Sequence, residues 1–312
     1  MILVVKSGGE AAVAEWRAGF AAHAPQLDVR WWDEPGLDPA RVEYAVVWDP
    51  EPGRLAGFPK LKAIFGSGAG VDHIASDPHL PPGVPVIRCV PWEAAQRMGE
   101  FVCWAVLSLA KEARRMAQLQ AARRWENVDP PFAAAARTVG IMGLGAMGEH
   151  TARMLLGLGI PVRGWSRGRK SIPGVESFAG AAELDAFLAG TDVLVCLLPA
   201  TPETQGIIAT PLLAKLPRGA GLVQVGRGSQ QVLPDILAAL DSGQLSGAVL
   251  DVFAPEPLPA ENPAWSHPGV IVTPHTASLP TRAERARYIA DVIAMLERGE
   301  APPHAYDPAR GY

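Results

Sequence analysis

Short hydrophobic runs alternate with longer amphipathic segments along most of this chain of 312 residues. In the first hundred residues the runs have the length of buried β-strands and lie at 2–5, 28–32, 44–48, 61–65 and 84–89. After the first run, residues 11–24 place Val13, Trp16 and Phe20 on one face of a helix. Strands that alternate with helices predict a parallel sheet with helices on both faces.

The same alternation resumes near residue 138 and continues toward the C-terminus. Further strands are expected at 139–142, 160–165, 192–198, 222–225, 247–252 and 270–272. Helices are expected at 181–189, 211–215 and 233–242, and another helical segment ends at Gly157. This second stretch therefore predicts a second α/β domain.

The two stretches are joined by residues 92–122, which have the pattern of one long amphipathic helix without proline. An irregular connector at 123–137 contains Asp129-Pro130-Pro131. A closing helix is expected at 281–298, returning to the first domain, and 301–312 form a tail. With a hinge placed near 98–100, the prediction is an α/β fold of two doubly wound parallel-sheet domains, Rossmann- or flavodoxin-like, with a cleft between them. One domain would comprise residues 1–98 and about 286–312, and the other residues 99–285.

Composition narrows the class of protein without specifying its chemistry. Hydrophobic residues make up 48% and charged residues 19% of the chain, and the net charge of −4 gives no indication of a nucleic-acid or membrane partner. No apolar run is long enough to span a bilayer. Cys89, Cys103 and Cys196 lie in apolar surroundings without metal-ligand spacing, so we expect reduced core thiols and no metal site. Residues 1–6 resemble a strand rather than a signal peptide, which predicts a cytoplasmic protein.

A glycine-rich turn follows the apolar run at 139–142 and precedes a helical segment and a second strand. It reads Gly143-Leu144-Gly145-Ala146-Met147-Gly148. In a dinucleotide-binding unit the first glycine makes the tight turn, the second lets the backbone approach a pyrophosphate, and the third packs the helix on the strand. The helix N-terminus at Ala146 and Met147 would offer N–H groups to the phosphates.

The residues after the second strand indicate which dinucleotide is preferred. NAD-binding sites usually have a carboxylate there, which accepts hydrogen bonds from the ribose 2′-hydroxyl. This chain has Trp165-Ser166-Arg167, followed by Arg169 and Lys170. A hydroxyl and three cations would attract a 2′-phosphate, which favours NADPH, with NADH possible. The alternative is a solvated basic loop.

Three further strand ends carry polar residues that could converge at one edge of the sheet. They are Arg227 between two glycines, Glu256 between two prolines, and His275 after Thr273-Pro274. Arg grips a carboxylate with two parallel hydrogen bonds, and His can donate a proton near neutral pH. An anion anchor, an acid and a carboxylate that orients the acid are what reduction of a 2-oxo acid requires. Against this, a lone Arg or Glu is usually a surface charge and a single His is more often structural. The structural interpretation is applied to the other histidines, namely His23, His73, His79, His150, His267 and His304.

With these motifs in order, the chain resembles the D-isomer-specific 2-hydroxyacid dehydrogenase family over nearly its full length. Within it, the resemblance is closest to bacterial reductases of glyoxylate and hydroxypyruvate. The segments that match are 140–148, 165–167, 197–201 with Thr204, 226–228, 250–253, 256–258, 273–275 and 309–312.

The resemblance implies roles for individual residues. Arg227 matches the substrate-binding arginine, Glu256 the carboxylate paired with the catalytic histidine, and His275 the general acid. The substrate carboxylate would be held by N–H groups at Ala69 and Gly70. Besides the glycine turn and 165–167, the positions that fall along the cofactor are Lys170, Leu198, Pro199, Thr204, Val225, Gly226 and Asp251.

Two other positions, Trp48 and Gln224, could affect how substrate and cofactor fit. Trp48 could cover a small substrate, although packing at a strand end explains it as well. Gln224 departs from the family pattern, because many members carry Asn there, and the change could tune cofactor fit.

The resulting hypothesis is an NADPH-dependent reductase that converts glyoxylate to glycolate, or hydroxypyruvate to D-glycerate. Family members are typically homodimers that pair through the cofactor domains, and a homodimer is expected here. Two alternatives stay open: an enzyme for a bulkier 2-oxo or 2-hydroxy acid, and a non-catalytic NAD(P)-sensing binding protein.

Overall fold

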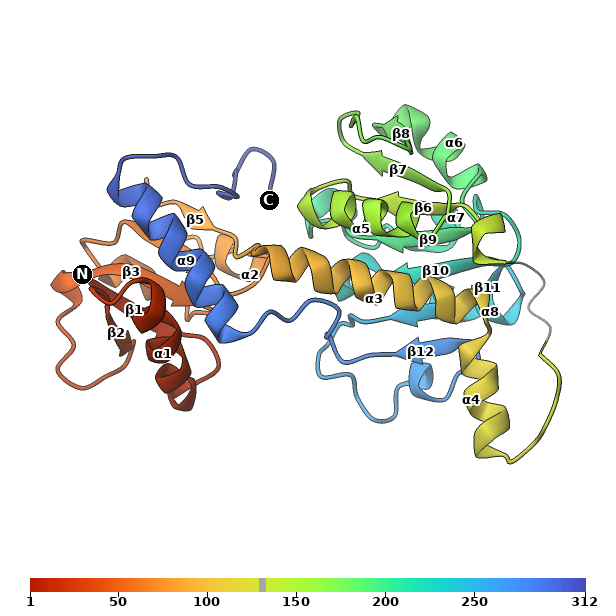
Figure 1. The fold of residues 1–312 in the computed structure, drawn as a ribbon, viewed down its shortest axis with the longest axis horizontal. Helices are drawn as coiled ribbons and strands as arrows, with labels where there is room; N and C mark the ends of the chain where they lie inside the picture. Colours follow the sequence, from red (N-terminus) through yellow and green to blue (C-terminus); the bar gives the residue numbers. More distant parts are fainter. Residues whose placement is uncertain (129–132) are drawn as a thin grey trace. The chain divides into compact units, whose positions relative to one another are not determined.

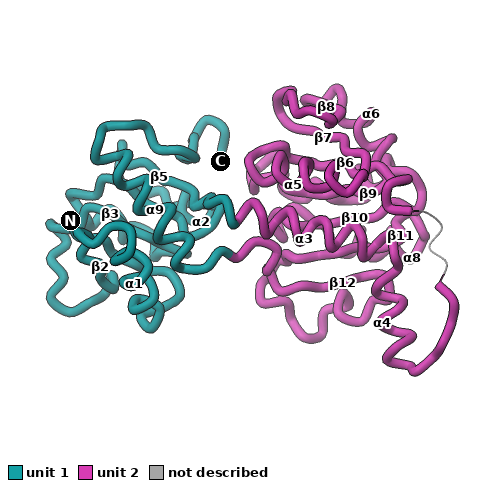
Figure 2. Tube along the Cα trace, viewed as in Figure 1, with its two compact units in different colours: residues 1–93, 280–312 teal, residues 94–279 magenta. Residues whose placement is uncertain are grey.

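The computed structural model describes residues 1–128 and 133–312, which form two compact units (Figure 2). Unit 1 comprises Met1–Glu93 and Pro280–Tyr312, and unit 2 comprises Ala94–Leu279. These divisions fall a few residues before the predicted ones at 98 and 286. The predicted Asp129-Pro130-Pro131 segment lies outside the described residues.

Unit 1 is built on a five-stranded parallel sheet in the order β2-β1-β3-β4-β5 (Figure 1). The strands are β1 (Ile2–Lys6), β2 (Asp28–Trp31), β3 (Val42–Val47), β4 (Ala63–Gly66) and β5 (Val86–Ile87). The helices are α1 (Val13–His23), α2 (Asp72–Ala75) and α9 (Arg282–Glu297). Although α9 comes from the far end of the sequence, it packs on α1, and Ile289 and Ile293 join Trp16 and Phe20 in one buried cluster.

Unit 2 contains a seven-stranded parallel sheet in the order β12-β11-β10-β9-β6-β7-β8. Its strands are β6 (Val139–Met142), β7 (Val162–Ser166), β8 (Val175–Ala179), β9 (Val193–Cys196), β10 (Ala220–Gln224), β11 (Leu245–Leu250) and β12 (Val270–Val272). Its helices are α3 (Trp92–Ala110, whose first two residues belong to unit 1), α4 (Ala113–Ala121), α5 (Ala146–Gly157), α6 (Leu184–Ala189), α7 (Thr210–Leu213) and α8 (Leu233–Asp241). Strand order reverses between β6 and β9, and in such sheets ligands bind outside the carboxyl ends of the strands at this point.

Both faces of each sheet are buried. In unit 1, Leu3 and Val5 belong to one hydrophobic cluster while Ile2 and Val4 belong to another. This alternation along β1 is what a strand between two helical layers requires. The predicted α/β class with two parallel sheets is therefore confirmed.

The long helix predicted at 92–122 is wrong as a single element. It is interrupted at Glu112, whose backbone is left-handed (φ 50°). The helix α3 buries residues as far as Ser108, whereas α4 buries none. Because α4 has no buried face, packing does not keep it in line with α3, and the chain turns just after the last buried residue of α3.

Two other segments differ from the prediction. Strand β8 was not predicted; it lies at the edge of its sheet, and none of its residues is fully buried, so its hydrophobic signal is weak. The predicted tail at 301–312 pairs with β5 at the edge of the unit 1 sheet. Ala305 bridges Ile87 in antiparallel fashion, and the Tyr306 N–H donates to the Val86 carbonyl at 2.7 Å.

The cysteines agree with the prediction of core thiols, because Cys89, Cys103 and Cys196 are all buried and free. Burial raises the pKa of both Cys89 and Cys196 to about 12. None of the described helices combines the length and the apolar character that crossing a membrane requires.

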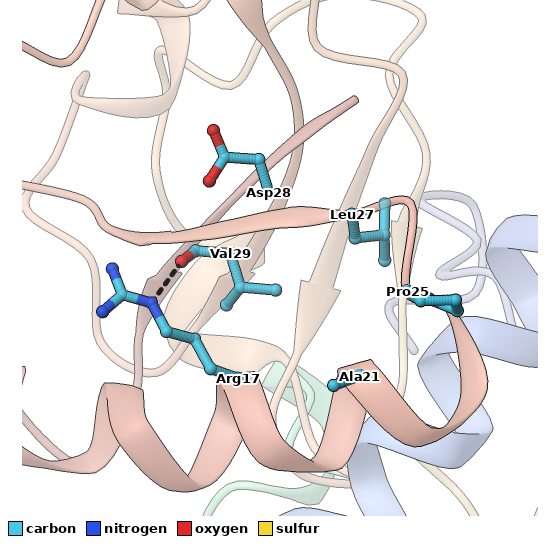
Figure 3. Close-up of a pocket in the computed structure, with 6 residues that line it drawn as sticks. All are labelled: Arg17, Ala21, Pro25, Leu27, Asp28 and Val29. Atoms are coloured by element: carbon cyan, nitrogen blue, oxygen red, sulfur yellow. Dashed lines mark hydrogen bonds between the residues drawn. The ribbon is translucent and has the colours of Figure 1, made fainter.

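A hollow of about 280 Å³ opens in unit 1 between α1 and the edge strand β2 (Figure 3). Its wall consists of Arg17, Ala21, Pro25, Leu27, Asp28 and Val29. Across it, Arg17 Nε donates to the Val29 carbonyl at 2.7 Å. None of the predicted site residues is part of this wall.

Candidate active site

The glycine turn after β6 has the geometry that a dinucleotide phosphate needs. Gly143 has φ of 104°, and a Cβ there would lie 2.6 Å from the Leu197 carbonyl oxygen. A Cβ on Gly148 would lie 1.9 Å from the Gly143 carbonyl oxygen, so a residue larger than glycine at this position would prevent the helix from beginning so close to the turn. Gly145 caps α5 without any side-chain hydrogen bond, and a Cβ built on it meets nothing within 4 Å. The N-terminus of α5 is thus open to an anion, and the turn fits the predicted cofactor.

The three cations of the loop after β7, Arg167, Arg169 and Lys170, are all exposed. Arg169 pairs with Glu183 and donates to the Ser177 carbonyl. Ser166 Oγ donates to the Gly168 carbonyl at 2.8 Å, and the hydroxyl would rotate away from this carbonyl to donate to a phosphate.

Arg227 occupies a tight turn at the carboxyl end of β10. Its guanidinium Nη1 donates to the Gly226 carbonyl at 2.9 Å. The next residue, Gly228, packs so closely on the segment after β11 that a Cβ would lie 2.0 Å from the Phe253 carbonyl carbon. A glycine is therefore required there, and the Arg227 turn lies directly against the segment that leads to Glu256.

His275 and Glu256 form the pair that the sequence predicts. His275 Nδ1 lies 2.8 Å from Glu256 Oε2, and the other carboxylate oxygen accepts the Phe253 N–H at 2.8 Å. Glu256 is thus fixed at both oxygens. Because the carboxylate accepts from Nδ1, the Nε2 edge of the imidazole is the one that can face a substrate. The two side chains are 38% and 36% exposed, so the pair is accessible from solvent.

Asp251 holds the backbone of the histidine segment. It is 1% exposed and accepts from Thr273 Oγ1 at 2.6 Å, from the Thr276 N–H at 2.9 Å and from the Ala277 N–H at 3.0 Å. His275 itself adopts φ of 52°, and its N–H donates to the Asp251 carbonyl at 2.8 Å. Both carboxylate oxygens of Asp251 thus bond within the protein, while its place along the cofactor stays a prediction.

The segment after β9 lies beside the glycine turn. The Leu197 N–H donates to the Met142 carbonyl at 2.8 Å, one residue before Gly143. Further along, Thr204 Oγ1 donates to the Pro199 carbonyl at 2.8 Å and accepts the Thr201 N–H at 2.9 Å, which closes a compact turn. Leu198 and Val225 are almost fully buried. Unit 2 therefore brings the glycine turn and this segment together at the carboxyl edge of its sheet.

The remaining predicted residues belong to unit 1. Trp48 follows β3 and is 42% exposed. Its ring lies 4.2 Å from the His73 ring, and one of its carbons lies 3.1 Å from a Cβ built on Gly68. Ala69 and Gly70 come next along this loop, after β4. The indole therefore covers the glycine-rich loop within its own unit.

Comparison with known proteins gives consistent similarities. A sequence model described as "D-isomer specific 2-hydroxyacid dehydrogenase, NAD binding domain" matches residues 103–277. A D-isomer specific 2-hydroxyacid dehydrogenase from Xanthobacter autotrophicus Py2, solved with NADPH and MES, is 40% identical over 100% of this chain and 99% of its own, with a TM-score of 0.93. The chain belongs to the D-isomer specific 2-hydroxyacid dehydrogenase family.

Two other solved structures carry more specific descriptions. One is an NADPH-dependent glyoxylate/hydroxypyruvate reductase from Sinorhizobium meliloti in complex with NADP and sulfate, 39% identical over 100% of this chain and 99% of its own, with a TM-score of 0.90. The other is a probable 2-hydroxyacid dehydrogenase from Rhizobium etli CFN 42 with NADP, HEPES and L(+)-tartaric acid, 37% identical over the same shares, with a TM-score of 0.91.

Sequence analysis of this 2-hydroxyacid dehydrogenase missed Glu183 and Gln230, which form hydrogen bonds to predicted site residues. Glu183 holds Arg169 and also accepts the Ala179 N–H at 2.7 Å, while Gln230 bonds to the Arg227 turn. Both are ordinary polar residues in sequence. The sequence contained one indication of the role of Gln230, which is that a polar residue follows Arg227 by three positions.

Proposed function

We propose that this dehydrogenase is an NADPH-dependent reductase of small 2-oxo acids, acting on glyoxylate and hydroxypyruvate to give glycolate and D-glycerate. The observation that carries the proposal is the 2.8 Å hydrogen bond between His275 and Glu256, whose own segment packs at Phe253 against the turn that carries Arg227. An acid with its orienting carboxylate, together with a guanidinium on the neighbouring turn, suits a substrate that has a carboxylate next to a carbonyl.

Each residue has a distinct task in the proposed reaction. A nicotinamide bound at the glycine turn would supply the hydride. The guanidinium of Arg227 binds the substrate carboxylate and orients the carbonyl. His275 donates the proton from Nε2 to the carbonyl oxygen as negative charge develops there, and Glu256 stabilises the imidazolium and fixes its ring. With Ala69 and Gly70 we assign N–H donors to the substrate carboxylate, and with Trp48 an indole wall that limits substrate size.

NADPH is the proposed cofactor, supported by three features. The glycine turn fits a pyrophosphate, no carboxylate follows β7 directly, and Ser166, Arg167 and Lys170 are suited to a 2′-phosphate. The Xanthobacter and Sinorhizobium structures contain NADPH or NADP. In the proposed site the remaining cofactor contacts come from Trp165, Leu198, Pro199, Thr204, Val225, Gly226 and Asp251.

We also propose that the protein is a cytoplasmic homodimer. Support for a dimer comes from large apolar side chains that are exposed on α3, on α4 and in the loop after α4, namely Trp104, Leu107, Met116 and Trp125. Covering exposed apolar side chains is a common basis of self-association. Three reduced core thiols suit a reducing compartment.

A panel of initial rates tests the proposed function. Purified protein is assayed with glyoxylate, hydroxypyruvate, pyruvate and a longer branched 2-oxo acid, each with NADPH and with NADH. We expect the largest kcat/KM for glyoxylate or hydroxypyruvate with NADPH. A maximum with the branched acid would contradict the substrate class, and no turnover in any combination would favour a nucleotide-sensing protein.

A further inference from the structure

One glutamine side chain connects the Arg227 turn to the segment after β9. Gln230 is fully buried. Its Oε1 accepts the Arg227 N–H at 2.8 Å, and its Nε2 donates to the Leu198 carbonyl at 3.0 Å and the Pro199 carbonyl at 2.8 Å. Both ends of the amide are therefore satisfied, one by the substrate-binding turn and the other by the segment proposed to lie along the cofactor.

A second buried glutamine holds the same turn from the other side. Gln224 is also fully buried, at the end of β10. Its Nε2 donates to the Arg227 carbonyl at 3.1 Å, and its Oε1 accepts the Gly226 N–H at 3.2 Å. The backbone N–H of Arg227 is thus fixed by one glutamine and its carbonyl by the other. Gln is one methylene longer than the Asn that many family members carry at this position, and here the longer side chain reaches both Gly226 and Arg227.

We propose that Gln230 and Gln224 are positioning residues that fix Arg227 for substrate binding. The inference rests on the proposed function, in which the guanidinium binds the substrate carboxylate. A guanidinium lies at the end of a long side chain, so a small rotation of the Arg227 backbone displaces it by a large distance. Misplacement of a substrate-orienting group by about 1 Å can cost on the order of 10²-fold in rate. Two neutral amides give the turn this rigidity without placing a second charge beside the substrate.

The same contacts would also be found if these glutamines only stabilised the fold, so a matched control is needed. Gln244 provides it, because its Nε2 donates to the Leu213 carbonyl at 3.0 Å and the Leu216 carbonyl at 2.9 Å. This is the same chemistry as in Gln230, in the same unit, but it joins two carbonyls that belong to no part of the proposed site.

The experiment compares Gln230→Met, Gln224→Met and Gln244→Met, which replace each amide by an apolar side chain of similar length. Three quantities are measured on the full-length protein: kcat and KM for glyoxylate, the dissociation constant of oxalate in the presence of NADP, and the dissociation constant of NADPH. Thermal unfolding shows whether each variant is folded. Should Gln230→Met fail to fold, Gln224→Met still tests the role, because it breaks only bonds to the Arg227 turn.

For Gln224→Met we expect kcat/KM for glyoxylate to fall about 10- to 100-fold and oxalate to bind about tenfold more weakly, with NADPH affinity within about threefold of wild type. Gln230→Met should show the same losses and weaker NADPH binding as well, since it also releases Leu198 and Pro199. Gln244→Met should lower thermal stability and leave all three functional quantities within about twofold.

Two contradicting outcomes are distinguishable. If the wild type is active and the two site variants match Gln244→Met in activity and oxalate binding, the positioning role is wrong while the proposed function stands. If the wild type neither reduces a 2-oxo acid nor binds oxalate, the proposed function is contradicted, and the positioning role is contradicted with it.

Discussion

The candidate catalytic side chains of unit 2 are positioned by neighbouring residues, which are fixed in turn by their own hydrogen bonds. Glu256 can orient His275 because the Phe253 N–H fixes its second oxygen, and the histidine segment is fixed by the buried Asp251. Residue types and spacing indicated Arg227, Glu256 and His275 as candidates at strand ends, and their roles were assigned from the family resemblance. The bracing bonds could not be predicted, because a buried glutamine or aspartate finds its partners only after the strands have assembled.

Two arginines in the loop after β7 give a test at this scale. Arg169 is bonded to Glu183 and to the Ser177 carbonyl, and Arg167 lies at the position proposed to meet the 2′-phosphate. Replacing Arg167 by Met should therefore raise KM for NADPH about tenfold and leave KM for NADH nearly unchanged. Arg169→Met serves as the control and should shift both KM values by similar factors. Equal loss of discrimination in the two variants would contradict the assignment.

The buried thiols give a second test. Because burial raises the pKa of Cys89 and Cys196 to about 12, both stay protonated at pH 8 and lack the thiolate that alkylating reagents attack. In unfolded chains thiols titrate near ~8.5, so this contribution to stability is present below that pH and is lost as the pH rises toward the folded value. Mass spectrometry after iodoacetamide treatment at pH 8 should find both residues unmodified in the folded protein and modified in urea. Rapid labelling of either residue in the folded protein would contradict the burial described here.

Whole helices and strands were predictable where one face is buried along their length. Helix α9 begins with a capping box, in which Thr281 and Glu284 exchange side-chain to backbone bonds, and its buried stripe runs to Ile293. Its limits were therefore clear in sequence. Where burial stops, as in α4, or is weak, as in β8, the hydrophobic pattern no longer determines the element.

The space around two helical glycines, Gly19 in α1 and Gly157 in α5, predicts opposite effects for their substitution by Ala. A Cβ on Gly19 would lie 2.8 Å from the Ala286 Cβ, so Gly19→Ala should lower the free energy of unfolding by about 1–3 kcal/mol. Gly157, at the end of α5, has nothing within 4 Å of a built Cβ, and Gly157→Ala should be neutral or stabilise by up to about 1 kcal/mol. Urea unfolding measures both. A stable Gly19→Ala would show that the helices tolerate wider spacing.

At the scale of the whole molecule, the chain passes between the two units twice, after Glu93 and after Leu279. Each unit has a complete parallel sheet and its own buried clusters. Within unit 1, Arg287 on α9 donates to both oxygens of Glu93, at 2.8 and 2.9 Å, so the two crossing segments are bonded on that side. The alternation of strands and helices predicted both sheets apart from the edge strand β8, and the return of the last helix follows from a buried face that packs on α1.

In the proposed reaction His275 protonates the carbonyl oxygen of a small 2-oxo acid. The most direct measurement is turnover of NADPH with saturating glyoxylate by His275→Ala, alongside NADPH affinity measured by nucleotide fluorescence. We expect turnover to fall about 10²- to 10⁴-fold while NADPH affinity stays within about threefold of wild type. Unchanged turnover in a variant that still binds NADPH would contradict the account.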